Sequence, residues 1–478
     1  MRWSIRGAGL LSTLVLARLL TPEDFGIVAM GTLVGGLLAS MSEMGIWQLL
    51  LRMRNADRSA YDTAWTIMLL QGVVLALAVF FAAYPAAEYF KEPRLVAVMQ
   101  VSALGSIIGA LSNIGTVMFR RDLDFRNDFI FEFIGKLLHV LPVIVLALIW
   151  RSYWALVIGT LVGHALDTLF SYRIHPFRPR LSLQGWRQFA SYSVWITPAY
   201  IANFLNQKAD VFIVGYLGTT AQMGAYNVAS ELSRMATAEI VQPLARAVYP
   251  NYAKLKDHLD ELTKAFLIVL RTVGVIAFFA GFWIGAVADD IVHVVLGDQW
   301  GFAVPLMPWM GLFGAFAVMQ TTVAGHILVV RHKERSMFVI TWARLAVFAG
   351  SLALTMKLGG GVVDLAMVAA MSTAAVMVAS LFYLPRVLDV SALGMLLEVG
   401  RVFSIGLVMF VAVRALHWSH APFRLLSLLM DSLVAAAVYL TLIGLTWRLA
   451  GQPDGPERRV VDLVRRRLRA SGAKGVAR

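Results

Sequence analysis

Three stretches of the sequence place charged and amide side chains at helical spacing among otherwise apolar residues. In the first stretch, Glu132, Lys136 and His139 occupy positions i, i+4 and i+7, which lie on one face of a helix. Ionisable groups inside a membrane are costly, and they usually face a partner or water there. Cations at such a place can bind an anionic group, and carboxylates can bind a proton or a sodium ion.

The same spacing recurs at two places further along the chain. These two stripes consist of Asn203, Asn206 or Gln207, and Asp210, and of Asn227, Glu231 and Arg234. Together the stripes favour a hydrated central cavity whose cationic character suits an anionic substrate. The predicted substrate-binding cations are Lys136, Lys208, Arg234, Arg246 and Arg344. The predicted ion-coupling carboxylates, which would bind H⁺ or Na⁺, are Asp210, Glu231, Glu132 and Asp167.

A purely structural interpretation of these residues stays open. Glu132 could pair with Lys136, and Glu231 with Arg234, so that each pair neutralises itself and only holds helices together. Three stripes at helical spacing nevertheless favour a cavity over isolated ion pairs.

No arrangement of residues indicates an enzyme or a metal site. His139, His164 and His326 lie on different predicted helices without the spacing of metal ligands, although His164 stands at i, i+3 from Asp167. No nucleophile stands beside a base, no P-loop is present, and every loop is short. We therefore predict transport without a cofactor, apart from a coupling H⁺ or Na⁺.

The composition identifies the elements that must carry these residues. Of the 478 residues, 59% are hydrophobic and 15% are charged, whereas soluble domains carry roughly 25% charged residues. Apolar stretches of roughly 20 residues, enough to span a bilayer as a helix, recur throughout. The chain is therefore predicted to be an all-α, polytopic membrane protein. It has no cysteine, which excludes disulfides and thiolate chemistry.

We expect about fourteen membrane-spanning helices. They are predicted at about residues 4–20, 26–51, 62–84, 95–119, 129–150, 153–172, 189–217, 221–249, 265–288, 302–328, 337–357, 362–384, 396–416 and 424–449.

The charge of the loops predicts the orientation. Basic residues cluster in the even-numbered loops, as at 52–58, 120–126 and 173–180, and basic short loops stay cytoplasmic. Both termini are therefore predicted to be cytoplasmic. The basic tail, residues 451–478, could bind anionic lipid headgroups or simply fix the topology. Because the excess of 13 positive charges lies mostly between spans, it does not indicate nucleic-acid binding.

The sequence LARLLTPEDFG, residues 16–26, interrupts the apolar N-terminus. It could mark the end of a signal peptide, but Arg18 stands where a small residue should precede cleavage, which favours a retained first span. The stretch is then the outer hairpin between the first two helices, with Pro22 in the first turn of the second helix. Arg18 itself could be an interface anchor or a substrate ligand.

A weak internal repeat predicts the domain organisation. Thr21 precedes Gly26 by five residues after the first helix, and Thr219 precedes Gly224 by the same spacing after the seventh. An even number of intervening helices gives both copies one orientation, as in a parallel repeat. We expect two six-helix lobes around a central cavity, followed by two further helices. The predicted parts are residues 1–175, 176–390, 391–450 and the tail 451–478.

Several segments resemble the polysaccharide transporter (flippase) family. They are LARLLTPEDFG at 16–26, Ser42–Gly45, Phe119–Phe125, Tyr153–Leu156, Asp210 with Ile213–Gly218, Gly224–Tyr226 with Ala229, Tyr249–Pro250 and Leu296–Trp300. The resemblance covers about residues 1 to 390 and is weaker over the last two helices. One departure is Ile46-Trp47-Gln48, where the family has small apolar residues.

The resemblance implies membership of the multidrug/oligosaccharidyl-lipid/polysaccharide exporter superfamily. It implies two rocking lobes that flip an undecaprenyl-pyrophosphate-linked oligosaccharide across the bacterial inner membrane, for exopolysaccharide or lipopolysaccharide synthesis. Membrane lipid and the lipid-linked oligosaccharide would be the partners, with a polysaccharide polymerase or co-polymerase as the protein partner. A cationic cavity suits a pyrophosphate.

Two rivals belong to the same superfamily. A drug/cation antiporter should have an acidic, aromatic cavity, and a lipid II flippase should be essential for growth. A membrane acyl- or glycosyltransferase would need a group of acid/base or histidine residues, and a scaffold would not need so many intramembrane charges.

Overall fold

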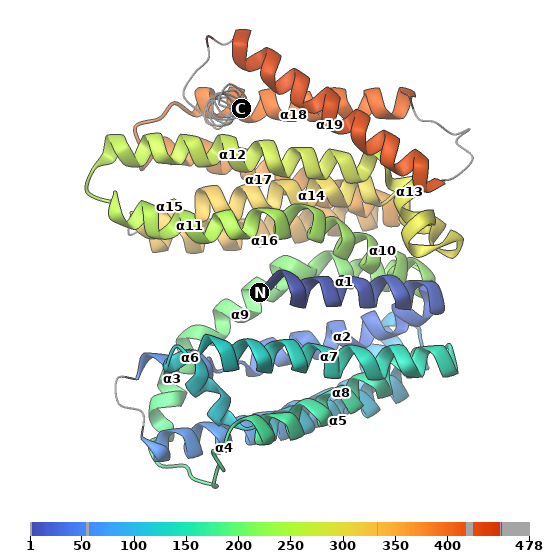
Figure 1. The fold of residues 1–478 in the computed structure, drawn as a ribbon, viewed down its shortest axis with the longest axis vertical. Helices are drawn as coiled ribbons and strands as arrows, with labels where there is room; N and C mark the ends of the chain where they lie inside the picture. The colour runs from blue at the N-terminus through green and yellow to red at the C-terminus, as the bar shows by residue number, and fades with distance from the viewer. Residues whose placement is uncertain (1, 54–56, 332, 417–423, 450, 452–478) are drawn as a thin grey trace, which may run out of the picture. The chain divides into compact units, whose positions relative to one another are not determined.

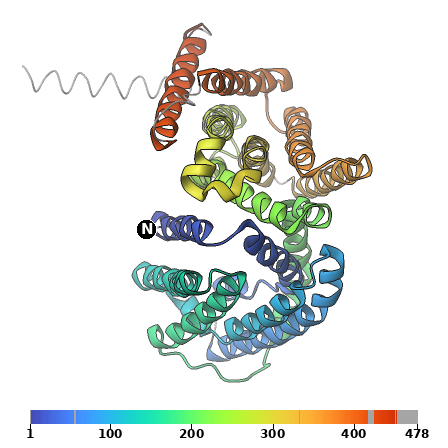
Figure 2. The same cartoon turned by 90° about the vertical axis from the view of Figure 1, so that its right-hand side faces the viewer.

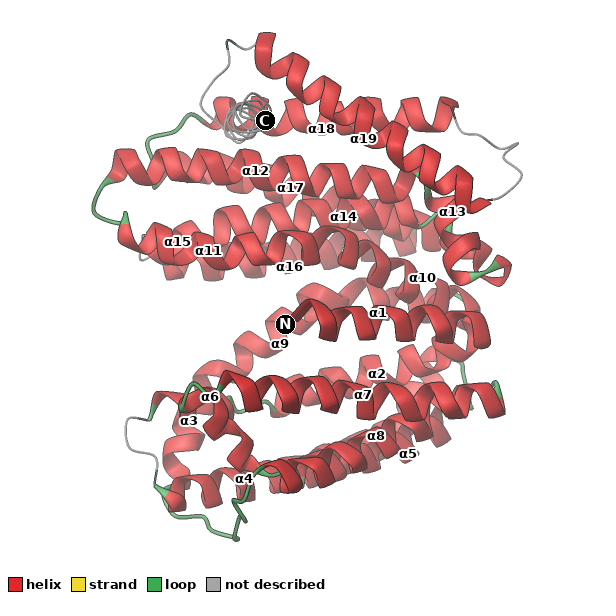
Figure 3. Ribbon diagram, in the orientation of Figure 1, coloured by secondary structure: helices red, strands yellow, loops and turns green. Residues whose placement is uncertain are grey.

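The computed structural model describes residues 2–53, 57–331, 333–416, 424–449 and 451. Every regular element in these residues is a helix, as the colouring of Figure 3 shows. This confirms the all-α class. The predicted basic tail lies, apart from Gly451, outside the described residues. The chain divides into two compact units, which we call unit 1 (Met1–Asn227) and unit 2 (Val228–Arg478).

Unit 1 is a bundle of long helices joined by short turns (Figure 1). Its elements are α1 (Arg2–Leu19), α2 (Pro22–Ser42), α3 (Ile46–Arg52), α4 (Arg58–Phe90), α5 (Leu95–Ala110), η1 (Ile114–Thr116), α6 (Val117–Arg121), α7 (Phe125–Trp150), α8 (Tyr153–Ile174), α9 (Trp186–Leu217) and the start of α10 (Thr220–Arg234). Helix α7 packs along α8, α8 also packs on α5, and α1 contacts α7. This packing brings the polar residues of α7 and α8 together.

Unit 2 is also a helical bundle, and Figure 2 shows several of its helices nearly end-on. Its elements are the end of α10, η2 (Met235–Glu239), α11 (Ile240–Lys254), α12 (Leu259–Ala286), α13 (Ala288–Ile291), η3 (Val292–Leu296), η4 (Asp298–Ala303), α14 (Met307–Met319), η5 (Gln320–Gly325), α15 (His326–Val330), α16 (Glu334–Lys357), α17 (Val362–Tyr383), η6 (Leu384–Arg386), α18 (Ala392–Leu416) and α19 (Arg424–Leu449). Helix α12 packs on α14 and α18, and α18 packs on α19.

Two predicted spans are broken, and the cause of each break is local. The span expected at 26–51 divides into α2 and α3 at Gly45, whose φ of +63° lies in the left-handed region that favours glycine. The span expected at 95–119 bends by 61° between α5 and the helical segment that begins at Ile114. At that bend the buried Asn113 side chain accepts from the Gly115 amide and donates to the carbonyl of Phe177. Side-chain hydrogen bonds therefore replace helix bonds there.

Ten described helices are long and apolar enough to cross a membrane, or eleven when the bent pair counts as one span. This confirms a polytopic membrane protein. Each of the fourteen predicted ranges overlaps a described helix or a broken one. Helix α1, helix α9 and the α10–α11 segment are not among the eleven, however, so the count of fourteen stays a prediction.

The two segments that suggested the internal repeat contact each other within unit 1. A Cβ atom added to Gly26 would overlap the carbonyl group of Thr220, and one added to Gly224 would overlap that of Pro22. Each glycine thus admits the first turn of the helix opposite. Asp24 completes a capping box with Thr21 at the start of α2.

Candidate functional site

A cluster of ionisable side chains lies between α7 and α8 of unit 1. The rings of His139 on α7 and His164 on α8 meet edge to face, with centroids 4.8 Å apart. Nε2 of His139 lies 3.9 Å from Oδ2 of Asp167, one turn further along α8. Both members of this pair keep a little under a third of their side-chain surface exposed. We call His139, His164 and Asp167 the imidazole–carboxylate cluster.

Glycines on three helices make room for this cluster. A Cβ atom on Gly163 would lie 2.7 Å from Nδ1 of His139, and one on Gly135 would lie 2.6 Å from Oδ1 of Asp167. On α5, a Cβ atom on Gly105 would lie 3.3 Å from Cδ2 of His164. These side chains therefore lie between closely packed helices.

The other two residues of the α7 stripe, Glu132 and Lys136, do not form the ion pair that their spacing allowed. Glu132 pairs with Arg120 of α6, which also bonds Asp128 at 3.0 Å, rather than with Lys136. The Lys136 side chain instead approaches Gly9 of α1, where an added Cβ atom would lie 3.4 Å from its Nζ. Arg120 lies in the segment before α7, so its partner could not be read from helical spacing. Lys136 forms no ion pair among the described residues.

Asp210 is the most buried of the predicted coupling carboxylates. It is 2% exposed, and its Oδ2 accepts a hydrogen bond of 2.7 Å from the hydroxyl of Tyr226, which is itself fully buried on α10. Oδ1 of Asp210 has no hydrogen-bond partner. Lys208, two residues earlier on α9, is half-buried and forms no ion pair in the described part of the chain. One oxygen of this carboxylate is therefore available to a proton or an ion.

Two predicted residues of unit 2, Glu231 and Arg234, form an ion pair. Nη2 of Arg234 lies 2.6 Å from Oε1 of Glu231, and Nε donates to the second oxygen at 3.2 Å. This two-point contact is the internal pairing that helical spacing allowed. Arg344 is half-buried on α16, and Arg246 lies on α11 with its side chain outside the described residues.

A second group of charges in unit 2 was not predicted. Nη2 of Arg271 on α12 donates to Oε1 of Glu398 on α18 at 2.7 Å, and Nη2 of Arg401 lies 3.4 Å from the other oxygen. Arg401 also donates to the hydroxyl of Thr446 on α19, at 3.3 Å. We call Arg271, Glu398 and Arg401 the arginine–glutamate network. Its sequence signal was three charges inside predicted spans, two of them at i, i+3.

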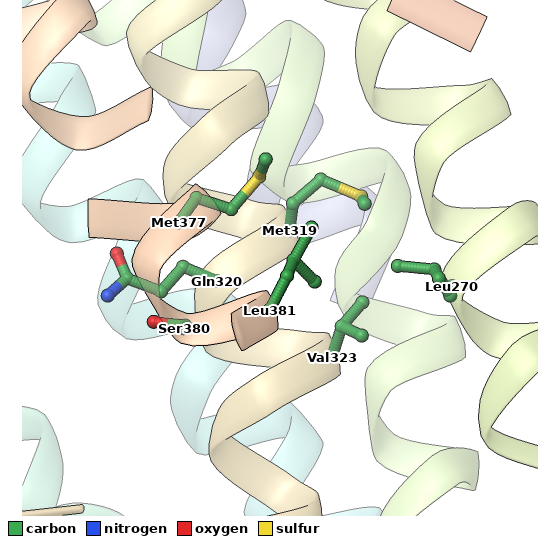
Figure 4. A pocket seen from close by; sticks show the side chains of 7 residues that line it. All are labelled: Leu270, Met319, Gln320, Val323, Met377, Ser380 and Leu381. Atoms are coloured by element: carbon green, nitrogen blue, oxygen red, sulfur yellow. The ribbon is translucent and has the colours of Figure 1, made fainter. Parts of the chain in front are cut away.

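A small pocket lies where α12, α14, η5 and α17 meet (Figure 4). Its walls are Leu270, Met319, Gln320, Val323, Met377, Ser380 and Leu381. The buried Oε1 of Gln320 has no hydrogen-bond partner, and the Ser380 hydroxyl donates to the carbonyl of Val376. A sugar site needs several convergent polar groups. This pocket offers too few of them to hold an oligosaccharide.

The turn between α4 and α5 contains a charged contact outside the predicted spans. The Glu92 carboxylate accepts from Nε and Nη2 of Arg94 at 2.8 and 2.7 Å and from the hydroxyl of Thr220 at 3.0 Å. The hydrogen bonds from Arg94 hold the pKa of Glu92 below its ordinary value. This contact ties the α4–α5 turn to the start of α10.

No group of three histidine or acidic residues in the described part of the chain has the arrangement of a metal site. With many apolar helices and ionisable side chains held at mid-span, the fold and these residues define a polytopic membrane transporter.

Comparison with known proteins defines the family. A family model described as polysaccharide biosynthesis protein matches residues 15–305. The chain belongs to this family. It is 23% identical over 97% of its length to the succinoglycan biosynthesis transport protein ExoT of Rhizobium meliloti, and the match covers 93% of that protein. It is also 23% identical to the lipopolysaccharide biosynthesis protein WzxC of Escherichia coli, over 65% of this chain and 64% of that one.

Solved structures show the same fold. The lipid II flippase MurJ in an inward closed conformation aligns with a TM-score of 0.73 at 12% identity, over 94% of this chain and 98% of that one. An inward-facing multidrug transporter of the MATE family aligns with a TM-score of 0.56 at 14% identity, over 83% and 95%. The family model and the curated relatives confirm the resemblance to the polysaccharide transporter family. The relatives are transporters, as the absence of enzyme signatures in the sequence predicted.

Proposed function

We propose that the protein is a flippase that moves undecaprenyl-pyrophosphate-linked oligosaccharides across the bacterial inner membrane, for exopolysaccharide or lipopolysaccharide synthesis. The observation that carries this proposal is the similarity to ExoT along almost the whole chain. ExoT is a succinoglycan biosynthesis transport protein, and WzxC is a lipopolysaccharide biosynthesis protein. A polysaccharide polymerase or co-polymerase would take over the flipped product.

The proposed architecture keeps fourteen spans, cytoplasmic termini and two six-helix lobes with the predicted boundaries. Helix α9 and the α10–α11 segment would be spans that line the cavity, because a span facing water carries more polar residues than one facing lipid. The lobes would alternate between inward-open and outward-open states around the cavity, with the lipid tail remaining in the bilayer.

In this mechanism, cationic side chains bind the pyrophosphate while the sugars lie in the hydrated cavity. Lys136 and Lys208 support this role, since neither forms an ion pair among the described residues. The predicted set also includes Arg234, Arg246 and Arg344. Arg234 already pairs with Glu231, so it would have to interact with Glu231 and the pyrophosphate at the same time. An H⁺ or Na⁺ bound at a carboxylate such as Asp210 would bias the two states through its differential affinity.

The test uses a strain that lacks the gene and is complemented with variants. Without the protein, we expect lipid-linked oligosaccharide to accumulate in the inner leaflet and surface polysaccharide to disappear. Variants Lys136→Gln, Lys208→Gln and Arg344→Gln should reduce surface polysaccharide at equal protein level. Lys357→Gln, at the exposed end of α16, is the matched control and should have no effect. Unchanged export in all three variants would refute the cationic cavity.

The same deletion separates this function from the rivals within the superfamily. Loss of surface polysaccharide with normal growth fits the proposed substrate. Growth arrest with accumulation of peptidoglycan precursor would instead indicate a lipid II flippase, and drug sensitivity alone would indicate a drug/cation antiporter.

A further inference from the structure

We infer that the imidazole–carboxylate cluster of unit 1 is a proton-binding site that couples the transport cycle to H⁺ rather than to Na⁺. The inference rests on the proposed function for its role in transport, but the proton site itself can be tested without any substrate. Its first support is position. His139 and His164 both lie near the middle of their helices, of 26 and 22 residues, which places them roughly 15–20 Å from either helix end.

Placing ionisable groups at such a position costs free energy that a contact serving only to hold helices together would not require. Ionisable residues at mid-span face a bundle interior or a water-filled path, and they mark ion or proton pathways. The helices here would pack more simply with apolar residues, since α5, α7 and α8 already approach closely through Gly105, Gly135 and Gly163. Instead, these glycines leave space that the polar rings and the carboxylate occupy.

The geometry of the cluster suits a proton that comes and goes. The 3.9 Å between Nε2 of His139 and Oδ2 of Asp167 is too long for a hydrogen bond but short enough for strong attraction once the imidazole is charged. Imidazole is also the side chain whose charge changes most readily near neutral pH. A proton can therefore bind His139, be stabilised by the charge of Asp167 and leave again without any hydrogen bond between the two side chains being broken.

The cluster binds only one proton at a time. Two imidazolium rings with centroids 4.8 Å apart would repel each other, so His139 and His164 cannot both be charged without a large cost. Lys136, one turn before His139 on α7, adds a fixed positive charge that also opposes a second proton. The cluster and Lys136 therefore change their net charge from zero to +1 when the proton binds.

The neighbouring elements supply no other described ionisable group at this depth. The sequence of α5 has none, and that of α2 has none between Gly26 and Ser42. Arg120 and Arg121 of α6 lie near the start of α7, where Arg120 is paired with Glu132. On α1, Arg18 lies at the outer end, and the side chains of Arg2 and Arg6 are outside the described residues.

The donor set also distinguishes a proton from a sodium ion. Hard cations require several oxygen ligands, whereas this cluster provides a single carboxylate and two imidazole rings. In the part of the chain that the structure describes, no three such residues are arranged to hold a metal ion.

The charge change gives the proton its effect on the transport cycle. The balanced, unprotonated set can be enclosed by the helices, whereas the set with net charge +1 is stabilised by water or by an anionic ligand. The free energy of proton binding therefore differs between an open and an enclosed state. Such a difference is what couples proton binding to the transport cycle.

The first test measures proton binding directly. The purified full-length chain, with ¹³C-labelled histidine, is titrated by NMR, and the resonances are assigned by their loss in His139→Gln and His164→Gln. We expect His139 to bind one proton between about pH 5 and 8, and its proton affinity to fall about tenfold in Asp167→Asn, which removes the attracting charge. His258→Gln, before α12, is the matched control and should leave the titration unchanged. An unchanged His139 titration in Asp167→Asn would overturn the inference.

The second test measures coupling. Proteoliposomes carry a fluorescent trisaccharide linked to a polyprenyl pyrophosphate, and a membrane-impermeant quencher reports flipping. With a pH gradient of one unit, we expect the wild-type rate to change at least about fivefold, and His139→Gln and Asp167→Asn to lose this response while His258→Gln keeps it. A response to a Na⁺ gradient alone would overturn the inference. A wild-type protein that flips none of the probe would refute the proposed function, and the NMR titration would still decide the proton site.

Discussion

The imidazole–carboxylate cluster of unit 1 and the arginine–glutamate network of unit 2 place charges in the membrane in opposite ways. In unit 2, Arg271 contacts Glu398 at 2.7 Å, and Arg401 and Thr446 extend the network over α12, α18 and α19. In unit 1, His139 and Asp167 stand 3.9 Å apart, and glycines surround them. Arginine keeps its charge at any physiological pH, whereas imidazole does not.

The difference separates two uses of buried charge. A network of fixed charges joined by contacts of 2.7 and 3.4 Å cannot change its charge without loss of structure, so it suits the attachment of α18 and α19 to the rest of unit 2. A loosely held cluster with titratable members can gain or lose a proton while the helices around it keep their packing. Sequence position alone does not distinguish these uses, because both groups appear as charges inside apolar spans.

The largest expected effect is on the stability of unit 2. Glu398→Ala removes the carboxylate that joins Arg271 and Arg401. Removal of one partner from a buried ion pair costs roughly 3–5 kcal/mol, and this network, which keeps up to 25% of a side chain exposed, should approach the lower end of that range. We expect a large fall in the unfolding temperature of the detergent-solubilised protein, followed by tryptophan fluorescence.

The matched variant replaces the whole network. Arg271→Met, Glu398→Leu and Arg401→Met together remove every charge at once, so stability should return close to that of the wild type. If Glu398→Ala unfolds at the wild-type temperature, the network does not hold these helices together, and the contrast with unit 1 disappears.

The next effect concerns Asp210, which is more deeply buried than the network but has only one oxygen bonded. Tyr226→Phe removes the hydroxyl that donates to Oδ2 and leaves the carboxyl group unsatisfied, which should cost about 1–3 kcal/mol. Asp210→Asn, in which the Tyr226 hydroxyl can still donate to the amide oxygen, should cost less in the same unfolding measurement. The reverse order would mean that the Tyr226 bond contributes little.

A smaller effect tests how closely unit 1 fits its cluster. Gly135→Ala places a methyl group 2.6 Å from Oδ1 of Asp167 and contacts no other group so closely, so it should displace that carboxylate for about 1 kcal/mol of stability. The proton affinity of His139 should then fall, by less than in Asp167→Asn. Gly31→Ala, whose Cβ atom would meet Leu95 at 3.5 Å, is the control and should leave the affinity unchanged. Equal affinities in the two variants would mean that Asp167 does not act on His139.

Sequence reasoning located the helices and identified several of the ionisable residues inside them. Apolar stretches predicted where the helices lie, and helical spacing allowed the Glu231–Arg234 pair, as an alternative to the predicted cavity roles, because its partners are three residues apart. The partner of Glu132 was missed because Arg120 reaches it across a turn in which Leu123 has a φ of +57°. That conformation is unusual for leucine and leaves no pattern in the sequence.

Contacts between distant helices could not be predicted in the same way. Arg271 and Glu398 are 127 residues apart, and only the packing of α12 against α18 brings them together. The approach of His139 to Asp167 likewise depends on the register of α7 against α8. The internal repeat stays a prediction, although its matched glycines Gly26 and Gly224 contact each other's helices.

The smallest expected effect lies outside the membrane and separates the cluster from other sources of pH dependence. The pKa of Glu92 is lowered, chiefly by the side-chain hydrogen bonds from Arg94, so the contribution of Glu92 to stability is fully present above its unfolded pKa, near 4.5. It is lost as the pH falls below that value through the lowered folded pKa. Because Arg94 is half-exposed and solvent screens the pair, the loss should stay below about 1 kcal/mol. In Glu92→Gln, the unfolding temperature should therefore fall less steeply between pH 5 and 3 than in the wild type. Between pH 5 and 8 the two proteins should respond to pH alike, and a difference there would mean that Glu92 contributes to a pH response assigned here to His139, His164 and Asp167.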